Sequence, residues 1–269
     1  MTHSSRCILA VAPMMDWTDR HCRYFLRLLS PRARLYTEMV TAEAVVRGDS
    51  ERLLRFDPAE HPVALQLGGS DAPAMAEAAR TGAQFGYDEI NINVGCPSAR
   101  VQSGQFGACL MADPEKVAAC LRAMRAVAHV PVTVKTRIGI DDRDSYRFLC
   151  DFVEPVAAAG CDTFLVHARK AILAGLSPKE NRLVPALDYA RVYRLKEEHP
   201  QLTIVLNGGI SSTEEALRHL EHVDGIMIGR EAYQNPWFLV ELEQALFGNA
   251  GNRPRDRHEI VRRMLPYIE

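Results

Sequence analysis

The 269-residue sequence lacks the hydrophobic features of a membrane or secreted protein. Its first apolar run, Ile8–Met15, is much shorter than the roughly 20 residues that a transmembrane helix needs. The run leads into Asp16-Trp17-Thr18-Asp19, without the small-residue cleavage pattern of a signal peptide. We therefore interpret it as a buried strand, and we expect a cytoplasmic protein with no membrane partner.

The cysteine spacings of a zinc ribbon or a disulfide framework are also missing. The chain has seven cysteines, an odd number, and no two of them stand in a C-x-x-C pattern. Paired spacings of that kind are typical of metal sites and redox dithiols. We accordingly expect neither a metal site nor disulfides, and a reducing cytosol as the compartment.

Neither sign of charge is in excess. The sequence has 32 lysines and arginines against 34 aspartates and glutamates, which gives a formal net charge of −2. Overall charge therefore does not indicate a nucleic-acid partner, and only local clusters can do so. Five arginines between residues 20 and 34 form one cluster, but an apolar stripe runs between them. That pattern is typical of an amphipathic surface helix, with RNA contact as the alternative.

What the chain does contain is a regular series of short, β-branched apolar runs. We expect strands at Cys7–Pro13, Arg34–Met39, Pro62–Leu67, Asp88–Val94, Pro131–Thr136, Thr163–His167, Thr203–Asn207 and Gly225–Ile228. Helical segments lie between most of them, with start signals at Asp71-Ala72-Pro73, Asp113-Pro114 and Ser211 with Glu214. Strands that alternate with helices are parallel, and eight units in about 240 residues fit a closed (β/α)8 TIM barrel. The alternative, an open doubly wound sheet, lacks its G-x-G-x-x-G fingerprint after the first strand.

Every expected strand ends in residues that are unusual for a plain core. They are Met14-Met15-Asp16, Glu38, Gln66, Asn93 with Cys96, Lys135 with Arg137, His167 with Arg169, Asn207-Gly208-Gly209 and Gly229-Arg230. The active site of a TIM barrel lies at the carboxyl ends of the strands. The eight strand ends together therefore predict one site.

The fourth strand ends in Asn93-Val94-Gly95-Cys96-Pro97. Pro97 biases Cys96 toward an extended conformation, on a bend at the strand end. A free cysteine is usually a small buried hydrophobic residue, but this position is suited to chemistry. At this point the roles of nucleophile, metal ligand and acid are all open.

The remaining strand ends predict a phosphorylated cofactor. Asn207-Gly208-Gly209 and Gly229-Arg230 follow the last two strands, where barrels commonly bind phosphate and where glycines let backbone N–H groups approach an anion. The amide of Gln66 can pair with the edge of a heterocycle, and a buried Lys135 needs an anion. His167 shares this rim. Together these residues indicate flavin mononucleotide (FMN).

Several short segments of the chain match the motifs of one known family. They are APMMDWTD at 12–19, QLGG at 66–69, NINVGCPS at 91–98, GACLM at 107–111, VKTRIG at 134–139, HAR at 167–169 and NGGI at 207–210. In this order they resemble the tRNA-dihydrouridine synthases. GLSPKENR at 175–182 further resembles subgroup A of that family, whose substrates are the D-loop uridines at tRNA positions 20 and 20a.

The resemblance implies roles for the matching positions. Pro13, Met14 and Met15 would form one wall of the flavin site, Gln66, Lys135 and His167 would contact the flavin ring, and Asn207, Gly208, Gly209, Gly229 and Arg230 would hold its phosphate. Cys96 would be the proton donor, and Asn93, Lys179 and Arg182 would contact tRNA.

The implied reaction is the reduction of a uridine to 5,6-dihydrouridine. NADPH would reduce FMN, the flipped-out uridine would receive hydride at C6, and Cys96 would protonate C5. The alternative is an FMN-dependent dehydrogenase of a free pyrimidine, similar to dihydroorotate dehydrogenases. The basic segment 169–185, with Lys170, Lys179 and Arg182, favours tRNA. We expect a monomer.

The resemblance also implies a second domain. We expect the barrel to occupy residues 1–245 and residues 246–269 to begin the helical tRNA-binding domain that this family adds after it. Because the sequence stops at Glu269, only the first turns of that domain would be present. Independent binding of tRNA by the 269 residues therefore stays open, whereas the flavin site of the barrel should be intact.

Overall fold

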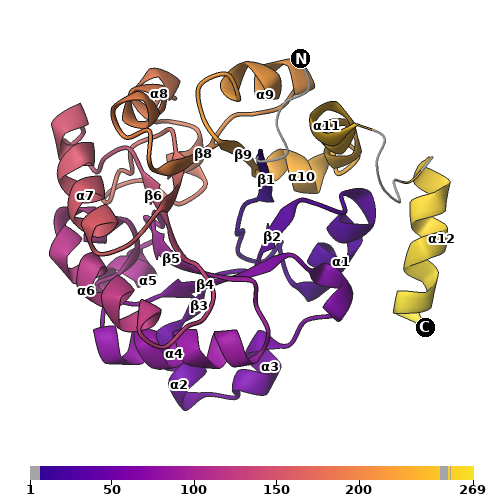
Figure 1. The fold of residues 1–269 in the computed structure, drawn as a ribbon, viewed down its shortest axis with the longest axis horizontal. Coiled ribbons are helices and arrows are strands. Elements are labelled where there is room, and N and C mark those ends of the chain that lie inside the picture. The colour runs from indigo at the N-terminus through magenta and orange to yellow at the C-terminus, as the bar shows by residue number, and fades with distance from the viewer. Residues whose placement is uncertain (1–6, 249–253, 255) are drawn as a thin grey trace.

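The structure is a computed structural model that describes residues 7–248, 254 and 256–269. Parallel strands form a closed ring at its centre, with helices around them (Figure 1). The strands are β1 (Ile8–Val11), β2 (Arg34–Tyr36), β3 (Val40–Thr41), β4 (Val63–Gly68), β5 (Glu89–Val94), β6 (Val132–Arg137), β7 (Thr163–His167), β8 (Thr203–Asn207) and β9 (Gly225–Ile228). Their order, β2-β1-β9-β8-β7-β6-β5-β4-β3, is closed by pairing of β2 with β4, which confirms the predicted TIM barrel.

Two short strands share one position in the barrel. β2 pairs with the beginning of β4 and β3 pairs with its end. The prediction of one strand over Arg34–Met39 was therefore wrong beyond Tyr36. At Thr37 the side-chain hydroxyl, in place of a backbone carbonyl, accepts the N–H of Gln66 at 3.0 Å. The regular backbone hydrogen bonding with β4 is interrupted at this residue and resumes at β3.

Helices cover the outside of the barrel (Figure 1). They are α1 (Arg20–Leu29), α2 (Ala42–Arg47), α3 (Ser50–Leu54), α4 (Ala72–Gln84), α5 (Ala99–Ser103), α6 (Pro114–Arg125), α7 (Tyr146–Ala158), α8 (Tyr189–Glu198), α9 (Thr213–His219), α10 (Arg230–Gln234), α11 (Phe238–Phe247) and α12 (Arg257–Ile268), with 3-10 turns η1 (Pro58–Glu60), η2 (Gly107–Ala112) and η3 (Glu180–Arg182). The predicted caps Asp71 and Asp113 are confirmed, since each side chain accepts an N–H of the first helical turn. The predicted cap of α9 was wrong by one residue, because it is Ser212, not Ser211, whose hydroxyl accepts the N–H of Glu215.

The strands bury two apolar layers of very different size. On β5, Ile90, Ile92 and Val94 belong to the large core between the strands and the helices. The barrel interior holds a much smaller apolar cluster, formed by Ala10, Ala12, Tyr36, Ala64, Leu165, Val205 and Met227. Burial of one aliphatic side chain contributes roughly 1.5–3 kcal/mol, so the outer layer supplies most of the stabilisation. The interior is thus able to carry the polar residues that a site requires.

Helix α1 is amphipathic, as predicted, but two of its arginines lie on its buried face. Arg23 forms an ion pair with the fully buried Glu60 at 2.6 Å. Arg27 donates to the backbone carbonyl oxygens of Ser30, Ala33, Glu60 and Pro62, and burial lowers its pKa to about 10. These two arginines therefore hold the fold together and cannot contact RNA.

The last helix, α12, lies beside α1 (Figure 1). The Tyr267 ring stacks on Tyr24 with centroids 3.8 Å apart, and its hydroxyl lies 2.9 Å from Nδ1 of His21. Residues 249–253 and 255, in the predicted second domain, lie outside the described residues. The predicted boundary at residue 245 falls inside α11, and the division into two domains stays a prediction.

No helix in the described ranges is long and apolar enough to span a membrane.

Candidate active site

The register of the sheet brings the predicted strand-end residues together. Asn93 on β5 pairs with Lys135 on β6, and Arg137 at the end of β6 pairs with His167 on β7. His167 in turn pairs with Asn207 on β8. Because neighbouring parallel strands lie about 4.8 Å apart, these five residues line one continuous rim of the barrel.

Three side-chain amides inside the barrel form a fixed hydrogen-bonded chain. Asn93 donates from Nδ2 to Oε1 of Gln66 at 2.7 Å, and Gln66 donates from Nε2 to Oδ1 of Asn91 at 2.8 Å. Asn91 then donates to the Thr133 hydroxyl at 2.8 Å. All three amides are buried. Each has one N–H left, so Gln66 can offer a heterocycle a donor in one defined orientation.

A buried carboxylate anchors the lower end of this chain. Glu89 is fully buried and accepts hydrogen bonds from the Thr133 hydroxyl at 2.5 Å and the Tyr36 hydroxyl at 2.6 Å. Its other oxygen accepts from Arg34 at 2.5 Å. The carboxylate is thus paired and hydrogen-bonded, as a buried charge must be. Burial beside Glu89 raises the pKa of Tyr36 well above its ordinary value, so its hydroxyl stays protonated as a donor.

The same Asn93 side chain shapes the turn that carries Cys96. Its Oδ1 accepts the backbone N–H groups of Gly95 at 3.1 Å and Cys96 at 3.0 Å. On the other side, the carbonyl oxygen of Cys96 accepts the N–H of Ala108 at 2.9 Å. Gly107 has a φ of +77°, and a Cβ there would lie 2.6 Å from that carbonyl oxygen. The half-buried thiol of Cys96 therefore stands on a turn that is held from both sides.

Basic side chains line the rim. Burial, and then the charge of Arg137, lower the pKa of Lys135 to about 7. Burial, followed by Arg137 and Lys135, lowers the pKa of His167 well below its ordinary value, so this imidazole is neutral near pH 7. In the part of the chain that the structure describes, no carboxylate pairs with the Lys135 ammonium. A buried cation without a counter-charge is costly, so an anion bound at this position would stabilise it.

Arg137 connects the rim to the long segment 169–185. It donates to the carbonyl oxygens of Gly95 at 2.9 Å, Lys170 at 3.1 Å and Asn181 at 3.2 Å. Within the segment, Asn181 is fully buried and exchanges hydrogen bonds with the backbone of Ile172. The segment is therefore a folded structure fastened to the Cys96 turn.

The basic residues of this segment differ in whether their side chains are exposed and already paired. Lys170 forms an ion pair with Asp144 at 2.7 Å, so a phosphate contact of this residue would have to compete with that carboxylate. Arg182 is exposed and close enough to Cys96 and Arg230 for electrostatic interaction. Lys179 is exposed, and its backbone carbonyl oxygen accepts the N–H of Arg182 at 3.1 Å.

The two glycine-containing loops have the backbone that the phosphate prediction requires. Gly208 and Gly209 have φ values of +119° and +79°, which favour glycine. A Cβ on Gly208 would lie 2.7 Å from the His167 ring, whereas around Gly229 the space is open. Helix α10 begins at Arg230 directly after that opening, so its first N–H groups have no partner within the helix. These features fit an anionic group.

The loop after β1 provides an apolar wall. Met15 is 54% exposed, whereas Pro13 and Met14 are half-buried. The N–H of Met14 is held by the Thr18 hydroxyl at 2.9 Å. An exposed methionine on an ordered loop at the barrel mouth suits contact with a flat ring. The residues present thus fit a flavin: an apolar wall, an oriented amide, a cation without a partner and an anion-binding loop.

Sequence reasoning missed the inner part of the site, Glu89, Asn91 and Thr133. The signal was present in residues 89–94, where polar and apolar residues alternate strictly. A strand covered on both faces is expected to be apolar throughout. The three polar positions on one face of β5 therefore already marked a polar barrel interior.

Comparison with known proteins agrees with this geometry. The family model described as dihydrouridine synthase (Dus) matches residues 10–269. A tRNA-dihydrouridine(20/20a) synthase of Vibrio cholerae serotype O1 is 58% identical over 270 residues, which cover 100% of this chain and 81% of that protein. One of the same name from Escherichia coli K12 is 60% identical over 261 residues, which cover 97% of this chain and 75% of that protein. The chain therefore belongs to the dihydrouridine synthase family.

Proposed function

We propose that the protein reduces uridines at positions 20 and 20a in the D loop of tRNA to 5,6-dihydrouridine, with FMN as cofactor and NADPH as electron donor. The observation that carries this proposal is the Cys96 turn, which Asn93 joins to the buried amide of Gln66. A proton donor and an oriented ring-binding amide are thus held in one rigid unit. The relatives that are 58% and 60% identical to this chain are named tRNA-dihydrouridine(20/20a) synthases.

The barrel residues fit the parts of the cofactor. Gln66, Lys135 and His167 would hold the ring, with Pro13, Met14 and Met15 on one side, and Asn207, Gly208, Gly209, Gly229 and Arg230 would hold the phosphate. Bound FMN, once reduced by NADPH, supplies the hydride for the pyrimidine double bond. The ammonium of Lys135 would gain a counter-charge when the ring is in its anionic reduced form, and the neutral His167 would contribute a hydrogen bond without adding charge.

Cys96 would complete the reduction as the acid. As C6 of the uracil accepts a hydride, the electron pair of the double bond moves to C5, and the thiol proton of Cys96 is transferred there. The sulfur is left as a thiolate, which water later reprotonates. Lys135, Arg137 and Arg182 interact electrostatically with Cys96 and would stabilise that thiolate.

The exposed Lys179 and Arg182 suit the tRNA backbone or the target base at the mouth. Asn93 has only one N–H left for a substrate, because its other groups hold Gln66 and the Cys96 turn. Its contribution to tRNA binding would therefore be a single hydrogen bond.

The proposal is tested by mapping dihydrouridine in tRNA from a strain that lacks this gene. We expect loss at positions 20 and 20a and restoration by the wild-type gene, but not by a Cys96→Ala gene. Loss only at other D-loop positions would assign another specificity. Turnover of free uracil or orotate, but not of unmodified tRNA, by the purified protein would favour the free-pyrimidine alternative instead.

A further inference from the structure

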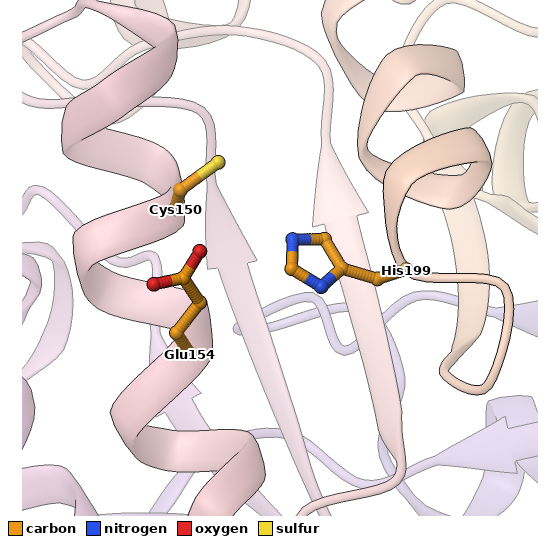
Figure 2. A group of neighbouring side chains, drawn as sticks. All are labelled: Cys150, Glu154 and His199. Carbon is orange, nitrogen blue, oxygen red and sulfur yellow. The ribbon is translucent and has the colours of Figure 1, made fainter.

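Three potential metal ligands meet on the outside of the barrel. Cys150 and Glu154 lie one turn apart on α7, and His199 follows directly after α8. Figure 2 shows the three side chains pointing toward one another across the space between these helices. Their ligand atoms all lie within 4.8 Å of one another. No other group of this kind occurs among the residues that the structure describes.

We propose that Cys150, Glu154 and His199 bind a zinc ion. A thiolate, an imidazole and a carboxylate are the donor types that Zn²⁺ accepts. The thiolate argues against Mg²⁺ and Ca²⁺, which prefer oxygen ligands alone. Packing alone would explain a buried cysteine, but not the convergence on it of a histidine and a carboxylate from two different elements.

The geometry needs only small adjustments to enclose the ion. Zinc bonds of about 2.0–2.3 Å in a tetrahedron place the ligand atoms roughly 3.3–3.8 Å apart. Glu154 is exposed and His199 half-buried, so both side chains can rotate inward, while the buried Cys150 fixes one vertex. Three protein ligands leave a fourth position for water.

The charges of the ligands suit a divalent cation, and the two arginines near them are already paired, Arg147 with Asp151 at 2.7 Å and Arg194 with Glu198 at 2.8 Å. The ionised forms of Cys150 and Glu154 carry two negative charges, which one Zn²⁺ neutralises. Glu198 adds another carboxylate nearby, but it already accepts hydrogen bonds from the Tyr146 hydroxyl and from Arg194, both at 2.8 Å. The Tyr146–Glu198 hydrogen bond already joins α7 to α8 beside the cluster, so a bound ion would reinforce an existing connection between the two helices.

The site is separate from the candidate active site. Its ligands belong to the outer helices, whereas Cys96, Gln66 and Lys135 lie at the strand ends inside the barrel. Zinc bound here would therefore act on the stability of the α7–α8 region, because an ion that binds only the folded state shifts unfolding by mass action. The spacing of these residues along the sequence did not predict a metal site, since two ligands lie on α7 and the third follows α8.

Metal binding by the purified full chain with its flavin tests the proposal directly. After treatment with a chelator, the protein is titrated with Co²⁺ and Zn²⁺ alone. We expect one equivalent to bind, a thiolate-to-cobalt charge-transfer band that Zn²⁺ displaces, and a higher melting temperature with Zn²⁺. Cys150→Ser and His199→Gln should weaken Zn²⁺ binding by more than the roughly 10- to 100-fold that loss of a supporting group costs. Glu154→Gln, at an exposed position, should weaken it without affecting folding.

Matched controls are available on neighbouring elements. Cys120→Ser changes a buried cysteine on α6, and His222→Gln changes a histidine that stacks on Tyr193 of α8. Both should bind Co²⁺ and Zn²⁺ like the wild type. The proposal is overturned if the wild-type protein binds neither ion, or if Cys150→Ser and Glu154→Gln keep the wild-type affinity and cobalt band.

Discussion

Asn93 donates a hydrogen bond to Gln66 across the barrel interior at 2.7 Å. The same side chain accepts the backbone N–H of Cys96 at 3.0 Å from its other end. One amide thus connects the ring-binding end of the site to the acid. If Gln66 holds the flavin ring and Cys96 is the acid, as proposed, Asn93 couples the two groups, and substitutions of Asn93 can separate the two roles.

Replacement of Asn93 by two different residues should have different effects. Asn93→Asp keeps the acceptor for the Gly95 and Cys96 N–H groups but removes the donor to Gln66. We expect it to weaken FMN binding roughly 2- to 10-fold, the worth of one hydrogen bond, with a near-normal rate at saturating FMN. Asn93→Ala releases the turn as well, and misplacement of the acid should slow tRNA reduction on the order of 100-fold. Flavin titration and single-turnover oxidation of the reduced flavin by tRNA measure both effects. Equal behaviour of the two variants would contradict the coupling.

Removal of the thiol should affect only proton transfer. Cys96→Ala is expected to retain FMN and its reduction by NADPH, because the hydrogen bond of the thiol goes to the Ser98 hydroxyl at 3.5 Å and not to the residues proposed to hold the flavin. A positioned general acid contributes about 10²–10⁴-fold, and dihydrouridine formation should fall by that factor. Anaerobic stopped-flow of the reduced enzyme with unmodified tRNA resolves this step. Cys120→Ala, on the outer helix α6, serves as the control, and wild-type turnover by Cys96→Ala would rule out the acid role.

The strands were predicted well where the sequence bounds them sharply. β7, β8 and β9 have the predicted ends, since each is a short apolar run between turn residues. β3 was not predicted, because two residues are too few for any periodicity. The site residues at the strand ends followed from the topology alone, since parallel strands in a closed barrel present all their carboxyl ends on one face.

Contacts between distant segments could not be predicted in the same way. The three carbonyl oxygens that Arg137 holds belong to residues 95, 170 and 181, and only the folded loops bring them together. For the same reason the sequence did not show that Lys170 is paired with Asp144. The ion-pair partner of a charged loop residue is set by the tertiary structure and cannot be read from the sequence.

The buried pair at the lower end of the polar chain should be important for stability. Arg34→Met leaves the fully buried Glu89 without its counter-charge. Loss of one partner of a fully buried pair costs about 3–5 kcal/mol, and we expect a smaller loss here because the Arg34 side chain is 32% exposed; urea denaturation of the variant would measure it. The double variant Arg34→Met with Glu89→Gln should recover most of that loss, because no unpaired charge is left. A double variant as unstable as the single one would show that packing, not charge, determines the effect.

The lowered pKa of Lys135 predicts a pH dependence of the flavin-free protein. In an unfolded chain the lysine pKa is about 10.4, whereas in the fold it is about 7. Between these two values the unfolded chain binds more protons, so the free energy of unfolding gains from this residue as pH rises through that window. Lys135→Met removes the cost of burying a charged ammonium in the folded state. Its stability advantage over the wild type should be largest below about pH 7 and should shrink toward about pH 10.

Urea denaturation of both apoproteins at about pH 6.5 and about pH 9 checks this sign. Lys116→Met is the control, since Lys116 is an exposed residue paired with Asp113 at 3.0 Å, and it should show no such trend. Addition of FMN followed by its reduction should shrink the difference between Lys135→Met and the wild type, because the reduced flavin ring is an anion and pairs with the ammonium. An advantage of Lys135→Met that is the same at both pH values would contradict the desolvated cation.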